Sequence, residues 1–407
     1  MQKQPLMSPA FELFLYKILT GLFFFFCFFP FTTSFRNGMD TQPWAFLFAF
    51  SLFFIMREKK LPGPLLFLFI PFIFSIFLAC VFPFDKDGFR AIIHYMSLFF
   101  IPAATYWVLK LRQKSLLTIL SITNVVWFTV GCIQYFFYRP FLSFLLTRAS
   151  SVHSLSRGCG GLSPEPSTYG TVCLFLMIFF YIESPKKKWP IVLLLIQVLF
   201  FAKSSVSLLI ILLIAIVVFI INGSFYTLIS IPISLTLFYK IVTSKLFEGS
   251  RLFSLINSFK VDPAQVIFKD ASLLDRYIGL EGSFRGFLTH YGIPRGLSAW
   301  VPYSHQEAER LGIINLRIIS TKILSGYGSV LFELGMVGLI PILVVVWLAF
   351  KLYPQRKRTA TILAVAITFL MITPVPIGFP YFCFLLGYMA YKAYGRLPAP
   401  DTEINKA

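Results

Sequence analysis

Two polar stretches of the sequence carry arginines and acids in patterns that could act on a charged substrate. The first runs from Arg157 to Ser167 with the sequence RGCGGLSPEPS. Its glycines allow the backbone to approach a ligand or another helix closely, and its prolines hold Glu165 in an extended entry to the following helix. Glu165 is then at the positive end of that helix, which favours the ionised carboxylate. The stretch could supply a cation and an acid to a reaction, or Arg157 and Glu165 could form a structural ion pair.

The second polar stretch places basic residues among acids and recurring apolar residues. Its candidate ligand-binding residues are Arg276, Arg285, Arg295, His290 and His305. An arginine presents a planar fork that grips phosphate or carboxylate in two places and stays charged at any working pH. As a set they fit a lipid-linked phosphate or pyrophosphate, although each one alone could be a solvated loop charge. The apolar residues through 271–297 predict helices that lie over a membrane surface.

Four further ionisable residues lie within or beside long apolar runs. A charge at the centre of a bilayer costs at least ~2.5–3.5 kcal/mol, so each of these residues needs an explanation. Arg90 and His94 lie four residues apart on one helix face, and Lys203 lies at a tight turn. Glu333 is deeper, so it needs a cation or a hydrogen-bond partner. Alternatively, Arg90 and Lys203 reach back to the interface, His94 is a packing residue, and the glycines around Glu333 serve close helix packing.

Motifs for metal or nucleotide chemistry do not stand out in the sequence. The six cysteines show no pairing and no Cys/His metal spacing. A Walker loop, a Rossmann glycine fingerprint, a paired-aspartate metal motif and a Ser-His-Asp order are also not recognised. We therefore predict no metal site and no cofactor.

The elements that must position these residues are transmembrane helices. Of the 407 residues, 57% are hydrophobic and only 13% are charged, whereas soluble domains have roughly 25% charged residues. A span needs ~20 mostly apolar residues, and the predicted fold class is an all-α polytopic membrane protein with about 12 such helices in one domain over 1–407. The predicted spans are 11–34, 42–56, 63–84, 91–109, 115–138, 167–183, 189–202, 205–222, 224–242, 326–351, 359–377 and 379–395.

The basic residues predict how this bundle is oriented. The net charge of +19 comes largely from short clusters between apolar runs, at 57–60, 110–114, 186–188 and 356–358. With both termini in the cytoplasm, all of these clusters face the cytoplasm, as the positive-inside rule requires. The charge then needs no nucleic-acid partner. This topology predicts two substantial loops on the other side of the membrane, at 139–166 and 243–325.

At these residues the chain resembles the superfamily of O-antigen polymerases and O-antigen ligases of the bacterial inner membrane. The stretch from Arg157 to Ser167 is similar to a segment of many polysaccharide polymerases. Ala271–Arg276, with 293–296 downstream, resembles the opening of their large outer loop. Gly326–Gly338, which contains Glu333, resembles the helix that follows that loop.

Two departures separate the chain from the ligases of this superfamily. Ligases usually have Ser-Arg at the turn where this chain has Lys203, and a lysine lacks the bidentate fork. They also carry a His-Asn pair where Leu324 and Ser325 stand here. These departures favour a polymerase, unless His290 or His305 folds into the same place.

The resemblance implies a GT-C-like architecture and an inverting, metal-independent glycosyltransferase between polyprenyl-pyrophosphate-linked glycans at the periplasmic membrane rim. Arg276, with Arg157 or Arg295, would hold the donor pyrophosphate, and Glu165 or Glu333 would act as the base. The bilayer and the lipid-linked donor and acceptor would be partners, and a chain-length regulator and a flippase would be further ones. The alternatives are an O-antigen ligase, a lipid-linked oligosaccharide transporter, or a non-catalytic scaffold.

Overall fold

The computed structural model describes residues 9–33, 41–56, 60–83, 85–112, 116–147, 158–223, 236, 239–240, 243, 251–261, 270–313 and 320–395. All regular secondary structure within these residues is helical, which confirms the all-α fold class for this part of the chain. The main helices are α1 (Pro9–Phe28), α2 (Trp44–Ile55), α3 (Gly63–Phe67), α4 (Phe69–Val81), α5 (Lys86–Arg112), α6 (Leu117–Phe136), α7 (Pro166–Glu183), α8 (Trp189–Ile196), α9 (Ser205–Asn222), α11 (Arg251–Val261), α13 (Ala271–Tyr277), α14 (Ser283–Thr289), α15 (Trp300–Arg310), α16 (Gly326–Leu334), α17 (Leu339–Leu352), α18 (Lys357–Ile372) and α19 (Pro380–Tyr394). Short π or 3-10 turns are η1 (Ser143–Leu145), η2 (Gln197–Ala202), η4 (Ile278–Gly282) and η6 (Gly335–Gly338).

Many of these helices have the apolar character of membrane spans. Among the described residues, 5 helical segments are long and apolar enough to cross a membrane. They are Gly63–Val81, Lys86–Leu111, Leu117–Phe136, Pro166–Glu183 and Gly326–Leu352. Shorter apolar helices cover Leu13–Phe28, Trp44–Ile55, Trp189–Ala202 and Ser205–Ile221. The fold is therefore that of a helical membrane-embedded protein, while the predicted number of spans stays a prediction.

Several predicted spans differ in their bounds from the observed helices or lie mostly outside the described residues. Helix α5 begins at Lys86 rather than at 91, because the Asp85 carboxylate accepts the backbone N–H groups of Asp87 and Gly88 and so caps the helix. The span predicted at 326–351 is broken by η6. The span predicted at 224–242 lies mostly outside the described residues.

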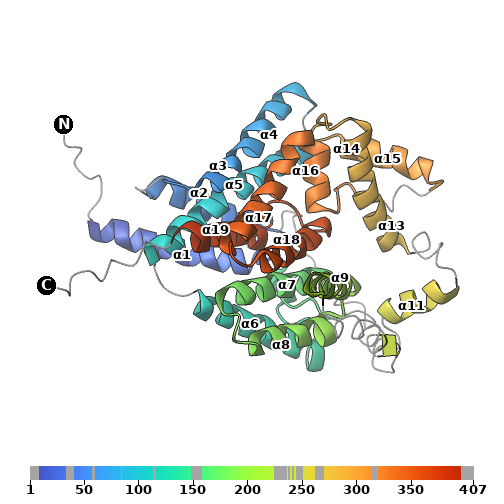
Figure 1. Cartoon of the computed structure of the whole chain (residues 1–407), viewed down its shortest axis with the longest axis horizontal. Coiled ribbons are helices and arrows are strands. Elements are labelled where there is room, and N and C mark those ends of the chain that lie inside the picture. Colours follow the sequence, from blue (N-terminus) through green and yellow to red (C-terminus); the bar gives the residue numbers. More distant parts are fainter. Residues whose placement is uncertain are drawn as a thin grey trace.

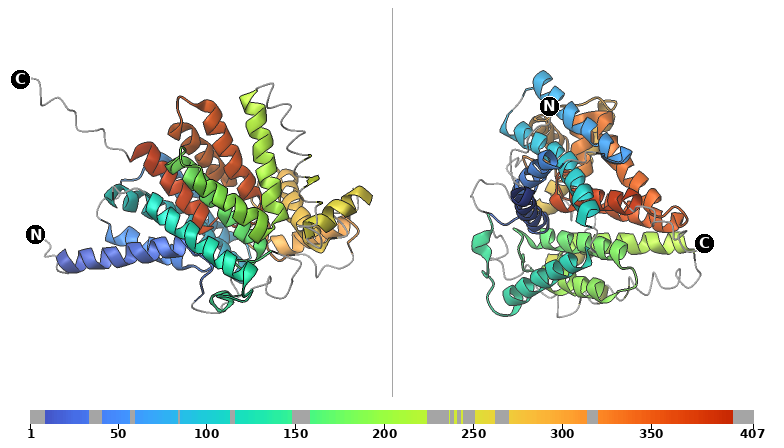
Figure 2. Two further views of the ribbon diagram at one scale, coloured as in Figure 1. Left: turned by 90° about the horizontal axis from the view of Figure 1, so that it is seen from below. Right: turned by 90° about the vertical axis from the view of Figure 1, so that its left-hand side faces the viewer.

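The helices are arranged in two groups with a smaller module at one end (Figure 1). In that view α6, α7, α8 and α9 (green) lie below α17, α18 and α19 (red), and contacts of α7 with α19 and of α9 with α18 join the groups. Helix α5 packs along α19 in the upper group. The two further views show α6, α7 and α9 beside the C-terminal helices (Figure 2).

Aromatic side chains fill the junction between these groups. Phe28, Phe179 and Phe384 are buried, and each of the three rings packs against the other two with 5.0–6.0 Å between ring centroids. The Tyr381 hydroxyl donates to the carbonyl oxygen of Phe28 at 2.7 Å, so the polar end of this ring is also satisfied. The phenylalanine-rich composition therefore serves helix packing as well as the exposed apolar faces.

Residues 270–313, which we call the loop module, have a small core of their own. This core contains Leu274, Ile278, Trp300, Tyr303, Ala308 and, from α16, Phe332. Since Phe332 belongs to α16, the module is fixed to the helix that also carries Glu333.

The break in the span 326–352 is the place where the loop module docks. Gly335 has φ of +60° and ψ of −136°, a conformation that is essentially restricted to glycine. The N–H of Met336 donates to the carbonyl of Gly292 at 2.8 Å, and the N–H of Arg295 donates to the carbonyl of Phe332 at 3.2 Å. Backbone groups released by the break are therefore satisfied by the loop module.

Candidate functional site

A polar cavity of about 930 Å³ lies where the two helix groups meet the loop module. Its walls come from α5, from 164–171 at the start of α7, from α13, from 297–302, from 320–324, from α16 and from 374–379. Its size fits a ligand larger than a single sugar ring. The acids that line it are Asp85, Asp87, Glu165, Asp275 and Glu333, and the basic residues are Arg90, His94, Arg276 and Lys322.

Five of the eleven residues singled out from the sequence meet in this cavity. Arg90 and His94 come from α5, Glu165 from the start of α7, Arg276 from α13 and Glu333 from α16. These residues are far apart in the sequence, so only the fold brings them together. Arg157 lies outside the described residues.

Glu165 is delivered by the glycine-rich loop 158–165, which is held from both sides. The side chain of Gln134 on α6 donates to the carbonyl of Gly161 at 2.9 Å and accepts its N–H at 2.8 Å. On the other side the N–H of Cys159 donates to the carbonyl of Phe201 at 2.8 Å. A Cβ on Gly158 would lie 2.0 Å from the carbonyl oxygen of Ala202, so only glycine permits this approach.

Glu165 is the residue that precedes the first turn of α7. Its backbone is extended, with φ of −141° and ψ of 150°, and Pro166 opens the helix. Ser167 lies inside the helix, and its hydroxyl donates to Oε2 of Glu165 at 3.3 Å. The helix therefore begins one residue before the predicted span 167–183, and the carboxylate lies at its positive end as predicted.

Glu333 has a hydrogen-bond partner of the kind that its depth in an apolar helix demands. The hydroxyl of Tyr95 on α5 donates to its Oε2 at 2.5 Å. Both side chains line the cavity. The pair connects α5 with α16 and leaves the second carboxylate oxygen to other partners.

The basic residues of the cavity come from three segments. His94 interacts electrostatically with Arg90 on its own helix and with Lys322 from the segment before α16. Arg276 on α13 adds another cation to the cavity wall. The two arginines and the lysine supply the groups that bind phosphate, and they do so in a cavity that also contains five acids.

Two aspartates connect the cavity walls to one another. Asp85 accepts the hydroxyl of Ser298 at 2.6 Å. This bond, followed by those from the backbone N–H groups that begin α5, lowers the pKa of Asp85. Asp275 accepts the N–H of Ser320 at 2.7 Å. Burial raises the pKa of Asp275, and the hydrogen bond and the adjacent Arg276 oppose that rise.

Several cavity residues have no counterpart among those predicted to bind or react. They are Asp85, Asp87, Asp275, Ser298, Trp300 and Lys322. Asp275 directly precedes Arg276 in the chain, which is a signal that the sequence contains. Lys322 and Asp85 are ordinary polar residues next to helix starts, so their sequence context does not distinguish them.

Five predicted substrate-binding residues do not line this cavity. Arg285 pairs with Glu281 at 3.0 Å, and Arg295 donates to the Gly286 carbonyl at 3.0 Å while its guanidinium stacks 4.5 Å from the Tyr303 ring centroid. Lys203 lies over the Tyr135 ring at 5.2 Å. The others are His290, whose Nδ1 is 3.0 Å from the carbonyl oxygen of Ile293, and His305 on α15.

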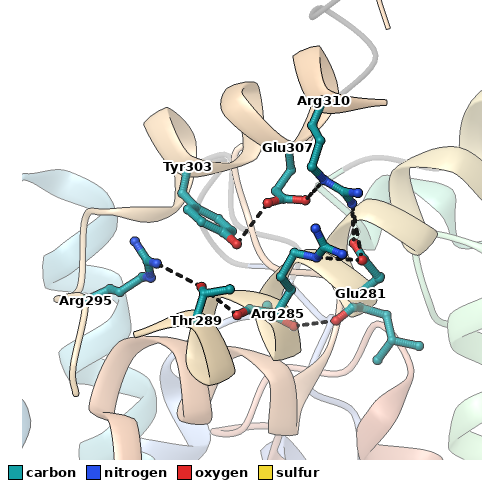
Figure 3. Close-up of polar contacts among 9 residues, drawn as sticks. Glu281, Arg285, Thr289, Arg295, Tyr303, Glu307 and Arg310 are labelled. Atoms are coloured by element: carbon teal, nitrogen blue, oxygen red, sulfur yellow. Dashed lines mark hydrogen bonds and ion pairs between the residues drawn. The ribbon is translucent and has the colours of Figure 1, made fainter. Parts of the chain in front are cut away.

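These arginines belong to a network that stabilises the loop module (Figure 3). Arg310 bridges Glu307 at 2.8 Å and Glu281 at 3.2 Å, and the Tyr303 hydroxyl donates to Glu307 at 3.1 Å. Burial and then the neighbouring Glu307 raise the pKa of Tyr303 to about 12, so this hydroxyl keeps its proton. The network joins η4 and α14 to α15.

Leu324 and Ser325, the two positions that the resemblance to ligases singled out, have local roles in this fold. The Ser325 hydroxyl accepts the N–H of Gly328 at 3.0 Å and caps α16, and Leu324 lines the cavity. Neither His290 nor His305 lines the cavity, whereas His94 does. Among the described residues, no group of three or more His, Cys, Asp or Glu side chains is arranged to hold a metal ion.

No model of a protein family matches the chain, and no curated protein matches it. The class that the fold itself defines is a helical membrane-embedded protein with a polar cavity beside its apolar helices.

Proposed function

We propose that this protein is a membrane glycosyltransferase that polymerises lipid-linked glycans, transferring a chain from polyprenyl pyrophosphate to a lipid-linked repeat unit. The observation that carries the proposal is the meeting of Arg276, Arg90, Glu165 and Glu333 in one cavity beside apolar helices. Cations that hold a pyrophosphate and acids that accept a proton are the two groups that such a transfer needs.

The reaction is a single displacement that inverts the anomeric carbon. A hydroxyl oxygen of the acceptor sugar forms a bond to the anomeric carbon of the donor, and the bond from that carbon to the pyrophosphate oxygen breaks. The electron pair leaves with the polyprenyl pyrophosphate, and the acceptor proton passes to Glu165 or Glu333. Arg276, with Arg90 and Lys322, stabilises the charge that develops on the leaving pyrophosphate.

The environment of the cavity supports the lipid-linked character of these substrates. The cavity is bounded by α5, α7 and α16, and each of these belongs to a segment apolar enough to cross a membrane. In the proposed topology the chain has about 12 spans, both termini are cytoplasmic, and 139–166 and 243–325 face the periplasm of the bacterial inner membrane. The polyprenyl tails then remain in the bilayer while the glycans occupy the cavity.

The experiment that tests the proposal compares lipid-linked and surface polysaccharide on gels. Cells lacking the protein are complemented with the wild type, Arg276→Ala, Glu333→Gln or Arg285→Ala at matched protein levels. Arg285→Ala is the control, because Arg285 belongs to the same module and pairs with Glu281 outside the cavity. We expect single repeat units without a ladder for the first two variants and a normal ladder for the control.

Three outcomes would contradict the proposal. Long chains stranded on the polyprenyl carrier in cells lacking the protein would indicate a ligase. Loss of periplasmic repeat units, with units accumulating on the cytoplasmic side, would indicate a transporter. A normal ladder in Arg276→Ala would remove Arg276 from the reaction.

A further inference from the structure

The loop module carries an exposed apolar tip, which we define as residues 288–293. Leu288 is 68%, Tyr291 is 91% and Ile293 is 57% exposed. Three large apolar side chains within six residues are unfavourable in water, because each leaves apolar surface unburied. The tip therefore has the composition of a contact surface.

Backbone hydrogen bonds hold the tip in one conformation. The N–H of Tyr291 donates to the carbonyl of Leu288 at 3.0 Å, and the N–H of Ile293 donates to that of His290 at 2.9 Å. The Gly292 carbonyl accepts the N–H of Met336 in the break between α16 and α17 at 2.8 Å. The tip therefore presents its side chains from a fixed platform.

Tyr291 occupies a conformation that its type disfavours. Its φ is +53°, in the left-handed region where glycine and asparagine are preferred and a bulky residue is an outlier. A tyrosine that is 91% exposed gains little from its own chain in return. The position instead displays an aromatic ring away from the protein, where an external contact offsets the cost.

The tip continues an apolar face made by two candidate membrane spans. Helix α4 contacts η6, and the rings of Phe67 and Trp347 meet at 6.0 Å where α3 and α17 lie together. From this contact the exposed apolar side chains extend to Val81 at the end of α4 and to Met336 in η6. A Cβ on Gly292 would lie 2.8 Å from Cγ of Met336, so the tip adjoins this face directly.

The chemistry of the tip fits the boundary between lipid tails and headgroups. Tyrosine is enriched at that level because its ring is apolar and its hydroxyl is wet. Thr289 and His290 lie between the apolar residues, and Arg295 lies just beyond them. A second copy of the chain or another protein would have to cover the same face that the two apolar helices present to lipid.

We propose that residues 288–293 insert into the interfacial layer of the bilayer and anchor the loop module to the membrane surface. The segment that follows, 297–302, forms part of the cavity wall. Anchoring the tip therefore fixes the height of this wall and holds the cavity at the membrane surface. This contact is separate from glycosyl transfer and requires only that the protein is embedded in a bilayer.

The experiment places a nitroxide spin label on the full-length protein in vesicles of phosphatidylethanolamine and phosphatidylglycerol. Cys80 and Cys132, which are not fully buried, are first replaced by serine. Labels are then attached in Tyr291→Cys and, as a second tip position, Leu288→Cys. The controls are Leu343→Cys on the exposed face of α17 and Gln306→Cys on the exposed side of α15.

The readout is collision of the label with oxygen, which partitions into lipid, and with a water-soluble nickel complex. We expect the oxygen-to-nickel collision ratio at 291 and 288 to exceed that at 306 several-fold and to lie below that at 343. A ratio at both tip positions equal to that at 306 would overturn the proposal. Low collision with both reagents and an immobilised spectrum would overturn it in favour of a protein contact. Neither result would bear on the polysaccharide ladder, so the two proposals fail separately.

Discussion

The hydroxyl of Tyr95 on α5 donates a hydrogen bond of 2.5 Å to Glu333 on α16. Both residues line the cavity, and they lie on two helices that are long and apolar enough to cross a membrane. An acid in such a helix is costly unless a partner satisfies it. Tyr95 is that partner, and it also sets which carboxylate oxygen remains open to the cavity.

Replacing Tyr95 by phenylalanine removes this donor while preserving the ring. We expect polymer synthesis per folded molecule to fall about tenfold to a hundredfold, since leaving a buried acceptor without its donor costs about 1–3 kcal/mol. Glu333→Gln should abolish synthesis, because it removes the carboxylate itself. Ladder formation by purified protein on lipid-linked repeat units measures each effect.

The matched control is Tyr388→Phe, because Tyr388 on α19 donates to Glu183, a tyrosine–glutamate pair outside the cavity. We expect this variant to lose thermal stability and to keep its activity per folded molecule. Wild-type activity per folded molecule in Tyr95→Phe would show that this hydrogen bond does not support the reaction.

We expect a single methyl group added at Gly335 to have a large effect on the stability of the protein. A Cβ there would lie 2.2 Å from the Gly292 carbonyl oxygen and 2.8 Å from the backbone nitrogen of Pro294. Gly335→Ala should therefore destabilise the protein by about 2–4 kcal/mol, through backbone strain and through loss of the docked loop. Thermal unfolding in detergent measures this, with Gly21→Ala as the control because nothing lies within 4 Å of a Cβ at Gly21. Equal melting temperatures of the two variants would contradict the docking role.

Part of the cavity could be predicted from the sequence, because ionisable residues in apolar runs cost free energy and so attract attention. Arg90, His94 and Glu333 are ionisable residues within or beside apolar runs. The free-energy cost of placing them there indicates that each has a partner or a function. All three line the cavity. The apolar runs likewise predicted the 5 helical segments that are long and apolar enough to cross a membrane, because ~20 apolar residues are needed to cross a bilayer.

Long-range packing explains what the sequence did not reveal. Asp85 and Lys322 are cavity residues only because the loop module and α16 fold against α5. Arg285 was assigned to a ligand because of its residue type, although Glu281 four residues earlier was a visible partner on the same helix face. The break at Gly335 could not be separated from simple close packing, since both use glycine.

Asp85, at the edge of the cavity, should make the stability of the protein depend on pH. The hydrogen bond from Ser298 and those from the backbone lower its pKa in the folded protein. Its contribution is therefore complete above the ordinary aspartate value of about 3.9 and is lost as the pH falls through the lower folded value. Because this side chain is exposed, we expect the contribution to be less than about 1 kcal/mol.

The measurement is the melting temperature in detergent across the acidic range. Wild type should be more stable than Asp85→Asn at neutral pH, and the difference should disappear at the acidic end. Adding Ser298→Ala to both proteins should reduce the difference in melting temperature between the protein with Asp85 and the Asp85→Asn variant, because it removes the hydrogen bond that lowers the pKa of Asp85 most. A difference that grows as the pH falls would reverse the assigned sign.

A substitution at Gln134 tests how strongly polymer synthesis depends on the glycine-rich loop 158–165. This buried side chain binds both backbone groups of Gly161 and also donates to the Phe141 carbonyl at 2.8 Å. Gln134→Ala leaves these groups without partners, so we expect a loss of about 2–4 kcal/mol in stability. We also expect loss of polymer synthesis, because the same loop carries Glu165 into the cavity.

A second substitution on α6 separates stability from positioning. Asn124 is also buried, and it accepts a hydrogen bond from Gln197 at 2.8 Å and donates one to the Pro190 carbonyl at 3.4 Å, two partners outside the loop 158–165. Asn124→Ala should lower the melting temperature to a similar degree and preserve synthesis per folded molecule. Gln134 acts on Glu165 only through the loop backbone. In Gln134→Ala we therefore expect polymer synthesis to fall by more than the loss of folded protein explains. Equal synthesis by the two variants at equal folded protein would mean that the placement of Glu165 does not limit the reaction.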